Sequence, residues 1–484
     1  MFMDGVTSDS PLVTKQNNPL TSFGELSVAE NFPIIQFLAP YGLIDKVETF
    51  NILGGAVTVS DSLFNMSSGT DANGRAVLLS RRQLTYHTGQ GLIARITAVF
   101  DTPVADHTQI AGLIGNTDSL TFGCLGTVFG IYHAHHGVSE IQNLNITGAA
   151  AGSENATVTI NGNPYTVPLT VGTVQHNAYE ISNSLNSQVA EYDFSSNDDN
   201  VTARSLLAAP AGSFAFASST ATATWSQTSA GVLPTDDFYP QSEWNLDPRP
   251  DLDPTKGNVF QIQMQYLGFG AITFFIEDSA SGKFMPVHRI GYANNNVLPS
   301  VSNPTFRLGW LSANQGNTVD KVLKGASAAG FLEGITRHTD RSRATSNSNT
   351  VVLTALNILT VRNRLVFGGR RNRVEVFGLF LTLATDANKA VIVDVHRGAT
   401  VAGDLDFSYI DEDSSVVEVA TEAGAVTGGT LMGSFAISAL EGATINLDDI
   451  GLLVLSDEIV TFSARAISGS GGAVTATLIW QEDI

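Results

Sequence analysis

NVFQIQMQYLGFGAITFFIE, residues Asn258–Glu277, is the stretch that decides the fold. Phe260, Ile262 and Met264 alternate with glutamines, and a period of two predicts a strand with one face in a core. The glycines of the following Leu-Gly-Phe-Gly segment allow a tight connection, because glycine adopts positive φ without steric cost. The alternation then resumes through Ile276. We therefore predict a β-hairpin at the centre of an antiparallel sheet.

The other face of this hairpin carries Gln261, Gln263 and Gln265. Three amides in a row on a flat surface suit a polar partner or a packed neighbouring element. They lack the charge that acid–base chemistry needs.

Composition favours a multidomain all-β protein. The chain has 484 residues, of which 43% are hydrophobic and only 15% charged. That length predicts two to four domains, and the hydrophobic content argues against wholesale disorder. The net charge of −21 argues against nucleic-acid binding, because such a surface repels phosphate.

Cys124 is the only cysteine, so no disulfide can form within the chain. This fits assembly in a reducing cytosol better than secretion. The first residues show no basic-then-apolar signal pattern, and no apolar run approaches the length of a membrane span. We expect no membrane insertion.

Changes of texture along the chain divide it into five segments. Residues 1–25 are a polar arm, and residues 26–311 form a first β-sandwich. Residues 140–229 are a small ββαββ unit inserted into that sandwich, with an Asn161-Gly162 hairpin turn and a helix capped by Thr173. Residues 312–350 are small and polar and are predicted to be a linker. Residues 351–484 contain short strands at near-regular spacing, which predict a second, jelly-roll-like sandwich.

Two groups of residues are candidate metal ligands. His133 and His135 fall on one face of a strand, the spacing of two ligands from one element. Asp247, Asp251 and Asp253 lie in an acidic, proline-rich loop that suits Ca²⁺. Exposed imidazoles at a strand end and a solvated Asp-Pro turn explain the same residues without a metal.

No catalytic motif stands out in the sequence. Hydrolysis of a glycosidic bond needs two carboxylates facing each other across a cleft. No Glu-x-Asp-x-x-Glu run occurs, and the adjacent Glu277 and Asp278 point to opposite faces of a strand. We therefore expect a protein that is not an enzyme.

Eight arginines lie within residues 337–373, and seventeen acidic residues follow from Val374 to the end. Guanidinium groups prefer bidentate carboxylate contacts, so this split predicts pairing between subunits or between domains. A solvated basic loop is the alternative. The residues assigned to a subunit interface are Arg362, Arg364, Arg370, Arg371 and Arg373.

Four blocks carry a resemblance to a known class of proteins. They are SRRQLTYHTGQGLIARITAVFD (Ser80–Asp101), QIAGLIGNTDSLTFGCLGTVFGIYH (Gln109–His133), DPTKGNVFQIQMQYLGFGAITFFIED (Asp253–Asp278) and ATLIWQEDI (Ala476–Ile484). With these blocks the chain resembles virion structural proteins of tailed phages and related large DNA viruses. The first three resemble a concanavalin-like, laminin-G-like lectin sandwich.

This resemblance implies a fibre, spike, baseplate or capsid-decoration subunit, made in the host cytoplasm and assembled with other virion proteins. It also implies a homo-oligomer, most commonly a trimer. The lectin-like domain implies contact with host surface glycan through Gln261, Gln263, Gln265, Tyr239 and Trp244. A secreted polysaccharide-degrading enzyme or a cell-surface adhesin is the alternative.

Overall fold

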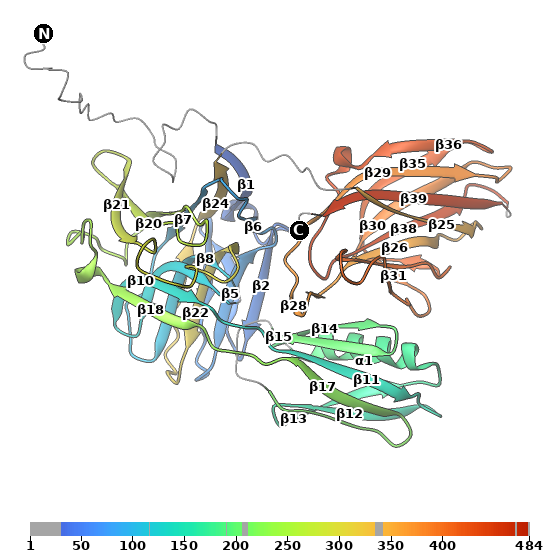
Figure 1. Ribbon diagram of the computed structural model, residues 1–484, viewed down its shortest axis with the longest axis horizontal. Helices are drawn as coiled ribbons and strands as arrows, with labels where there is room; N and C mark the ends of the chain where they lie inside the picture. Colours follow the sequence, from blue (N-terminus) through green and yellow to red (C-terminus); the bar gives the residue numbers. More distant parts are fainter. Residues whose placement is uncertain are drawn as a thin grey trace, which may run out of the picture.

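The structure is a computed structural model that describes residues 31–115, 117–189, 191–205, 212–333, 342–469 and 472–482. The arm predicted over residues 1–25 lies outside these ranges. The chain forms two β-sandwiches and a smaller unit inserted into the first (Figure 1). The prediction of a mainly β protein is confirmed. None of the described helices has the length and apolar character needed to cross a membrane.

The N-terminal sandwich packs two antiparallel sheets face to face. The first has the order β1 (Asn31–Leu38), β24 (Ser327–Glu333), β7 (Leu92–Ala98), β19 (Asn258–Met264), β20 (Ile272–Asp278) and β21 (Lys283–Ile290). The second has the order β18 (Thr235–Pro240), β10 (Val128–His135), β9 (Ser119–Leu125), β8 (His107–Ile114), β22 (Thr305–Asn314), β5 (Arg75–Ser80) and β2 (Val47–Ile52), and β6 (Leu84–Thr85) pairs with β22 to make it eight-stranded. A small third sheet joins β3 (Ala56–Ser60), β4 (Leu63–Ser67) and β23 (Val322–Gly325). The 3₁₀ turns of this domain are Ala39–Tyr41 and Gln241–Glu243.

The predicted hairpin lies at the centre of the six-stranded sheet. Phe260 of β19 pairs with Ile276 of β20, and β7 and β21 flank the two strands. The alternating residues Phe260, Ile262 and Met264 are all buried in one aromatic-rich core that includes Trp310. This outcome follows from the period of two, which places every second side chain on one face.

The inserted unit spans β11 (Ile141–Gly148) to β17 (Thr222–Ser229), close to the predicted bounds. Its two sheets contain β14 (Tyr192–Asn197), β15 (Asn200–Ser205), β11 and β17, and β13 (Asn163–Leu169), β12 (Glu154–Ile160) and β16 (Phe214–Ala217). Its helix α1 is Val174–Gln188, and the Thr173 hydroxyl accepts a hydrogen bond from the His176 amide at 3.1 Å. Ile181 and Leu185 pack with the strands in a separate hydrophobic core. The unit therefore has the local core that the sequence predicted.

The predicted linker is largely incorrect. The N-terminal sandwich extends to residue 333 through β22, β23 and β24, and β24 pairs with both β1 and β7. Ala328 and Gly330 alternate toward the core, but these side chains are too small to give a hydrophobic signal. Arg343–Thr350 is already an edge strand, β25, of the second sandwich. Its residues are polar, because an edge strand buries little of either face, and so they lack the hydrophobic alternation that predicts a strand.

The C-terminal sandwich again has two sheets. The first contains β25, β39 (Ala473–Glu482), β29 (Val376–Thr385), β36 (Gly442–Asn446) and β37 (Leu453–Val454). The second contains β32 (Ser408–Tyr409), β33 (Val417–Ala420), β26 (Leu356–Asn363), β38 (Ile459–Ala466), β30 (Val391–Arg397) and β35 (Thr430–Ile437). Short pairs join β27 (Val366–Phe367) to β28 (Arg370–Arg371) and β31 (Thr400–Val401) to β34 (Val426–Thr427), and Leu447–Ile450 is a 3₁₀ turn.

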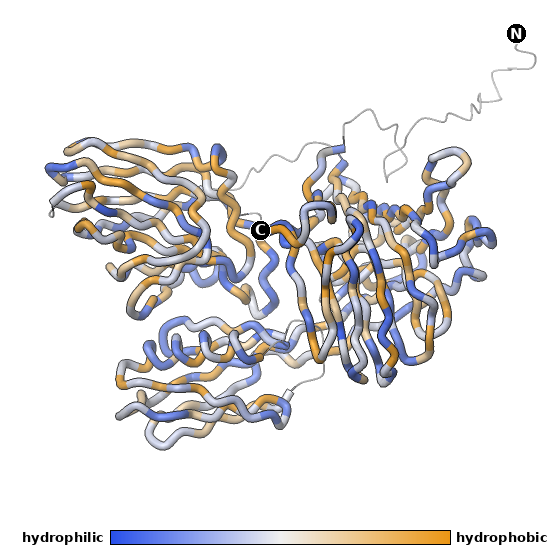
Figure 2. The backbone as a smooth tube through the Cα atoms, turned by 180° about the vertical axis from the view of Figure 1, so that it is seen from behind, coloured by the Kyte–Doolittle hydropathy of each residue, from blue (hydrophilic) through white to orange (hydrophobic). Residues whose placement is uncertain are grey.

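Hydrophobic and hydrophilic residues alternate along the strands of all three parts (Figure 2). The β27–β28 hairpin descends from the C-terminal sandwich toward the inserted unit, beside the N-terminal sandwich (Figure 1). The three parts therefore meet in one place, and that place contains the arginines singled out in the sequence.

Candidate functional site

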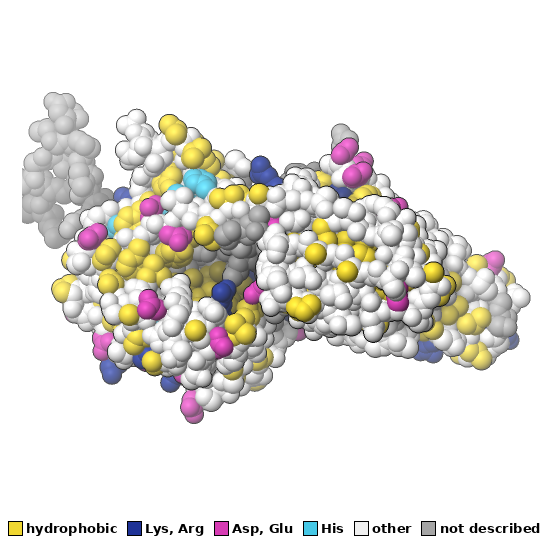
Figure 3. Space-filling view, turned by 90° about the horizontal axis from the view of Figure 1, so that it is seen from below, with side chains coloured by type: hydrophobic (Ala, Val, Ile, Leu, Met, Phe, Trp, Pro, Cys, Tyr) yellow, Lys and Arg dark blue, Asp and Glu magenta, His cyan; other side chains and the backbone are white. Residues whose placement is uncertain are grey.

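Four glycines on neighbouring strands leave a shallow hollow on the outer face of the eight-stranded sheet, because no side chain fills the space above them. Gly309 of β22 lies opposite Gly112 of β8, and Gly123 of β9 lies opposite Gly130 of β10. A Cβ atom at Gly123 would lie 2.1 Å from the carbonyl oxygen of Gln109, so the close strand approach there requires glycine. In the view from below, hydrophobic side chains gather around a hollow in the surface, together with a basic side chain and several acidic ones (Figure 3).

Aromatic and aliphatic side chains stand on both sides of these glycines. The strand register places Tyr132 and Phe238 toward one edge of the sheet and Phe50 and Leu311 toward the other. Each of these four side chains is partly exposed. Seven strands about 4.8 Å apart give a face roughly 30 Å wide, which suits an extended ligand.

The strands of this sheet place no pair of carboxylates across the hollow. Among their residues, Asp236 of β18 and Glu48 of β2 are the acidic side chains on this face. These strands are the two edges of the sheet, so six strand spacings separate the carboxylates by roughly 29 Å. A glycosidase needs its two carboxyl groups about 5–9.5 Å apart.

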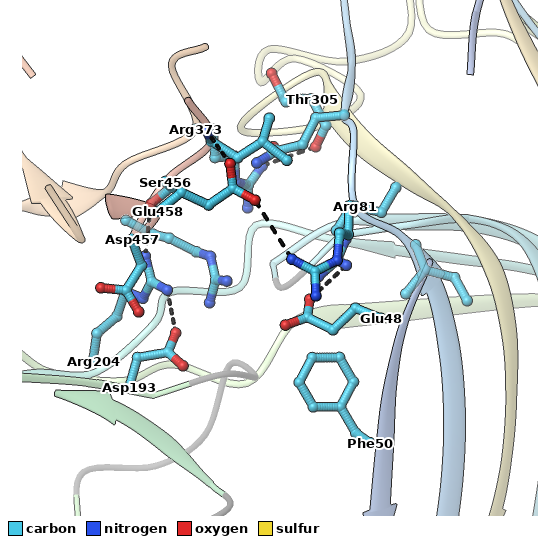
Figure 4. Close-up of a pocket in the computed structure, with 16 residues that line it drawn as sticks. Glu48, Phe50, Arg81, Asp193, Arg204, Thr305, Arg373, Ser456, Asp457 and Glu458 are labelled. Carbon is cyan, nitrogen blue, oxygen red and sulfur yellow. Dashed lines mark hydrogen bonds and ion pairs between the residues drawn. The ribbon is translucent and has the colours of Figure 1, made fainter. Parts of the chain in front are cut away.

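A cavity of about 210 Å³ lies at the β2 end of the hollow, where all three parts of the chain meet (Figure 4). Five arginines line it, together with four acidic residues. The arginines are Arg81 and Arg307 of the N-terminal sandwich, Arg204 of the inserted unit, and Arg371 and Arg373 of the C-terminal part, and the acids are Glu48, Asp193, Asp457 and Glu458. The cavity is thus locally positive in a chain whose net charge is −21.

Several of these groups are paired across the cavity wall. Nη2 of Arg307 donates to Oε2 of Glu48 at 2.6 Å, and Nη1 of Arg81 lies 3.5 Å from Oε1 of Glu458. Burial, followed by the charge of Asp193, raises the pKa of Asp457 above its usual range.

Two of the predicted interface arginines are buried inside the C-terminal sandwich and at its boundary. Nε of Arg362 donates to Oε2 of Glu418 at 2.7 Å, and its Nη2 donates to the carbonyl of Ser196 in the inserted unit at 2.6 Å. Nη2 of Arg364 donates to the carbonyl of Glu412 at 2.6 Å. These side chains are 5% and 6% exposed, so they bond within the chain.

Arg371 and Arg373 also reach other parts of the same chain. Arg373 donates from Nη1 to the carbonyl of Thr305 at 3.2 Å, and Nη1 of Arg371 lies 3.5 Å from the carbonyl of Ser205. Burial lowers the pKa of Arg373 to about 10. Arg370 is exposed. Arg362, Arg371 and Arg373 therefore contact other parts of the chain, as expected for pairing between domains, whereas the hydrogen bonds of Arg364 lie within its own sandwich.

The predicted carbohydrate residues of the hairpin lie on the other sheet. Gln261 is 4% exposed, and its Oε1 accepts a hydrogen bond from Nε of Arg95 at 2.8 Å. The Arg95 guanidinium in turn lies over the rings of Phe284 and Phe331. Gln263 and Gln265 are partly buried on the same outer face. The amide of Gln261 is therefore engaged within this face, and the cavity of about 230 Å³ that lies beside it is lined by Arg95 and by residues of β1, β7, β19 and β24, not by the three glutamines.

Tyr239 and Trp244 lie apart from these glutamines. The Trp244 ring is 4% exposed and packs edge-on against Phe122 in the core, while its Nε1 donates to the carbonyl of Tyr239. The Tyr239 ring packs against His288, with centroids 4.6 Å apart. The structure does not bring the five predicted carbohydrate residues together, and Trp244 has no face open for a sugar.

The predicted calcium loop uses its carboxylates locally. Oδ1 of Asp247 accepts from the amide of Arg249 at 2.9 Å, and Asp251 pairs with Nη2 of Arg249 at 3.0 Å. Oδ1 of Asp253 accepts from the Thr255 amide and hydroxyl at 2.9 and 2.6 Å. These bonds form turns, and the three carboxylates do not converge on a shared position.

His133 and His135 do converge with a third side chain. Asp237 of β18 lies directly opposite His133 of β10, and its Oδ2 is 3.1 Å from Nε2 of His135. Burial, followed by the neighbouring His135, lowers the pKa of His133 to about 4. The sequence could not indicate Asp237, because the inserted unit separates the two strands along the chain.

Comparisons with known proteins show likeness at the level of solved structures. No protein-family model matches the sequence, and no curated protein matches it. Similar structures include an endo-acting O-glycanase of the human gut microbiota (8% identity, TM-score 0.30, 63% of this chain and 100% of that one). A cellulose-induced protein (10%, 0.26, 61% and 96%) and peanut lectin (9%, 0.24, 64% and 100%) are also similar.

At these identities and TM-scores the likenesses carry no argument about this chain, and the description of the N-terminal domain as a β-sandwich rests on the strand order given above. The expected likeness to virion proteins finds no support among them.

Proposed function

We propose that this protein binds carbohydrate in the hollow of the eight-stranded sheet without cleaving it, and that the arginine-lined cavity receives an acidic group of that carbohydrate. The observation that carries the proposal is the position of this cavity, at one end of a hollow with partly exposed aromatic rings. Aromatic faces stack on sugar rings, and guanidinium groups bind carboxylate and sulfate.

The charge of the whole chain narrows the ligand class. A net charge of −21 repels a continuous polyanion, whereas the cavity offers a local excess of arginine over carboxylate. A mainly neutral glycan with a terminal or occasional carboxylate group fits both features. Binding without cleavage is supported by the wide separation of Asp236 and Glu48 across the sheet, and by the arginine pairs that engage Glu48, Asp193 and Glu458 in the cavity itself.

The test compares binding of neutral and carboxylate-bearing oligosaccharides by isothermal titration calorimetry. Arg81 is the variant of choice, because its side chain is 42% exposed and pairs only loosely with Glu458. A charged hydrogen bond contributes about 1.5–3 kcal/mol, so Arg81→Ala should weaken the acidic ligand roughly 10- to 150-fold in Kd.

Arg465→Ala is the matched control, because Arg465 has the same 42% exposure and a similar loose pair with Asp394 in the C-terminal sandwich. It should leave binding unchanged. Equal effects of the two variants, or equal binding of neutral and acidic ligands, contradict the cavity's role. Release of reducing ends from any ligand contradicts the proposal that the protein binds without cleaving.

The expected position in a virus particle, the assembly into a trimer and the synthesis in a host cytoplasm stay predictions.

A further inference from the structure

Two histidines and an aspartate meet at the edge of the N-terminal sandwich, where β10 pairs with β18. One nitrogen of each of His133 and His135 and one carboxylate oxygen of Asp237 all lie within 4.8 Å of one another. Within the described part of the chain, no other group of three His, Cys, Asp or Glu side chains converges in this way. The cluster is separate from the hollow and plays no part in the function proposed above.

The hydrogen bonds of His133 fix its protonation. Its Nε2 lies 2.8 Å from the backbone carbonyl oxygen of Ser300. Because a carbonyl only accepts, Nε2 must carry the proton, and Nδ1 of the neutral ring is left with a bare lone pair. This Nδ1 is fully buried, has no hydrogen-bond partner among the described residues, and faces Oδ2 of Asp237 at 3.9 Å.

The hydrogen bonds of His136 determine which nitrogen of the neutral His135 ring carries the proton. Nε2 of His136 lies 2.9 Å from the carbonyl oxygen of Pro299, so that nitrogen carries a proton and Nδ1 of His136 accepts. Nδ1 of His135, 2.8 Å away, is then the donor. Nε2 of His135 is therefore the bare nitrogen, and it faces Oδ2 of Asp237 at 3.1 Å.

Three lone pairs thus point toward one another with no proton among them when both rings are neutral and Asp237 is ionised. An acceptor facing an acceptor at this distance is repulsive, and a cation between them removes the repulsion. We propose that His133, His135 and Asp237 bind a divalent transition-metal ion, with Zn²⁺ as the preferred occupant.

The ligand types select this class of ion. Imidazole nitrogens suit Zn²⁺ and its neighbours in the first transition row, whereas Ca²⁺ and Mg²⁺ prefer oxygen ligands throughout. Tetrahedral Zn²⁺ with bonds of about 2.0–2.1 Å needs its ligand atoms about 3.3 Å apart. Oδ2 of Asp237 already lies 3.1 Å from Nε2 of His135, and from 3.9 Å it has to approach Nδ1 of His133 by about 0.6 Å. Asp237 can supply this movement, because it lies on an edge strand and its side chain is 44% exposed. The two ring nitrogens lie within 4.8 Å of each other and have to approach by at most about 1.5 Å. The exposed side leaves a fourth coordination position for water or a ligand.

The surroundings hold the histidines as outer-shell partners usually do. Backbone carbonyls accept the far N–H groups of His133 and His136, which fixes ring orientation. The His136 backbone has φ of +60°, and Oδ1 of the buried Asp118 accepts its amide proton at 3.1 Å. A bound metal would therefore tie β18 to β10 and, through these bonds, to residues 299–300.

The experiment titrates Zn²⁺ into chelator-treated full-length protein and follows heat, and repeats the titration with Co²⁺ to follow its visible absorption. We expect one ion per chain and a higher melting temperature in its presence. Asp237→Asn keeps size and shape, and it should weaken Zn²⁺ binding by at least about 10-fold, as loss of even an outer-shell partner does. His135→Gln should act in the same direction.

Asp236→Asn is the matched control, because Asp236 is the adjacent carboxylate on the opposite face and bonds the Tyr132 hydroxyl instead. It should leave Zn²⁺ binding within about 2-fold. A folded protein that binds no Zn²⁺, or binding that survives both Asp237→Asn and His135→Gln, overturns the proposal. Ring ¹⁵N shifts showing His135 protonated on both nitrogens at neutral pH with excess Zn²⁺ also overturn it.

Discussion

The interior of the N-terminal sandwich and the junction of the three parts both bury basic side chains, but by different means. Inside the sandwich, His107 and His288 are 1% and 3% exposed, and burial lowers the pKa of each to about 4. At the junction the buried bases are arginines such as Arg362 and Arg204, which donate to a carboxylate of their own part and to a backbone carbonyl of another.

The difference shows two solutions to one problem. A buried charge is costly unless it is neutralised or hydrogen-bonded. Histidine gives up its proton near physiological pH, whereas arginine cannot and therefore requires partners. Low pH should therefore destabilise the N-terminal sandwich, whereas removal of a hydrogen-bonding partner should destabilise the junction.

The largest effect we expect is acid destabilisation of the N-terminal sandwich. Unfolded histidines bind protons below pH about 6.5, whereas folded His107 and His288 do so only below about 4. The unfolded state therefore binds more protons in this window, and stability present above pH 6.5 is lost as the pH falls toward 4. Each histidine contributes about 3 kcal/mol. The free energy of unfolding in urea at pH 7.5, 5.5 and 4.5 measures this loss.

His107→Gln and His288→Gln serve as its controls. Each variant should flatten the dependence of stability on pH by its own share. An unchanged slope in both variants would mean that other groups cause the acid sensitivity.

The second effect is loss of the ion pair between Arg362 and Glu418. Both side chains are nearly buried, with 5% and 4% of their surface exposed, and their nearest atoms are 2.6 Å apart. Arg362→Ala leaves the Glu418 carboxylate buried without its cation and should cost about 3–5 kcal/mol in the free energy of unfolding. Denaturant titration at pH 7.5 measures it.

The double variant Arg362→Met, Glu418→Leu should recover most of that stability, because apolar residues of similar volume replace a buried pair without leaving a charge. A loss below about 1 kcal/mol for the single variant would place the pair in effective contact with water.

The sequence predicts those elements whose large side chains alternate. The central hairpin and the inserted unit are recognisable because Phe260 and Ile262, or Thr173 before an amphipathic helix, give strong local signals. The strand β24 is missed because Ala328 and Gly330 fill the core positions with little hydrophobic content. A larger residue at Gly330 would crowd the core, since its Cβ would lie 3.2 Å from the side chain of Leu84.

For the candidate sites, too, the sequence predicts local features but not contacts between distant parts of the chain. The spacing of His133 and His135 predicts two ligands on one face, but Asp237 joins them through a strand pairing about a hundred residues away. The aromatic Trp244 in a polar, proline-rich loop suggests an exposed binding residue. Only the folded structure shows that the loop returns over the core and buries it. Local sequence gives the direction of a side chain within its strand, and tertiary contacts decide what it meets.

The smallest effect we expect on stability comes from removing an exposed ion pair, and two such pairs allow the junction to be compared with the interior of one sheet. Arg81–Glu458 joins the N-terminal sandwich to the C-terminal part at 3.5 Å, and Arg465–Asp394 joins two strands of one sheet at 3.7 Å. The exposures are the same in both pairs, 42% for the arginine and 13% for the acid.

Exposed pairs contribute about 0–1 kcal/mol and are screened by salt, so Arg81→Ala and Arg465→Ala should lower the free energy of unfolding equally and slightly. Urea unfolding at low and high salt measures both. A loss above about 2 kcal/mol for Arg81→Ala alone would assign Arg81 to the junction that holds the parts together. Its effect on glycan binding would then reflect a displaced domain rather than a lost contact.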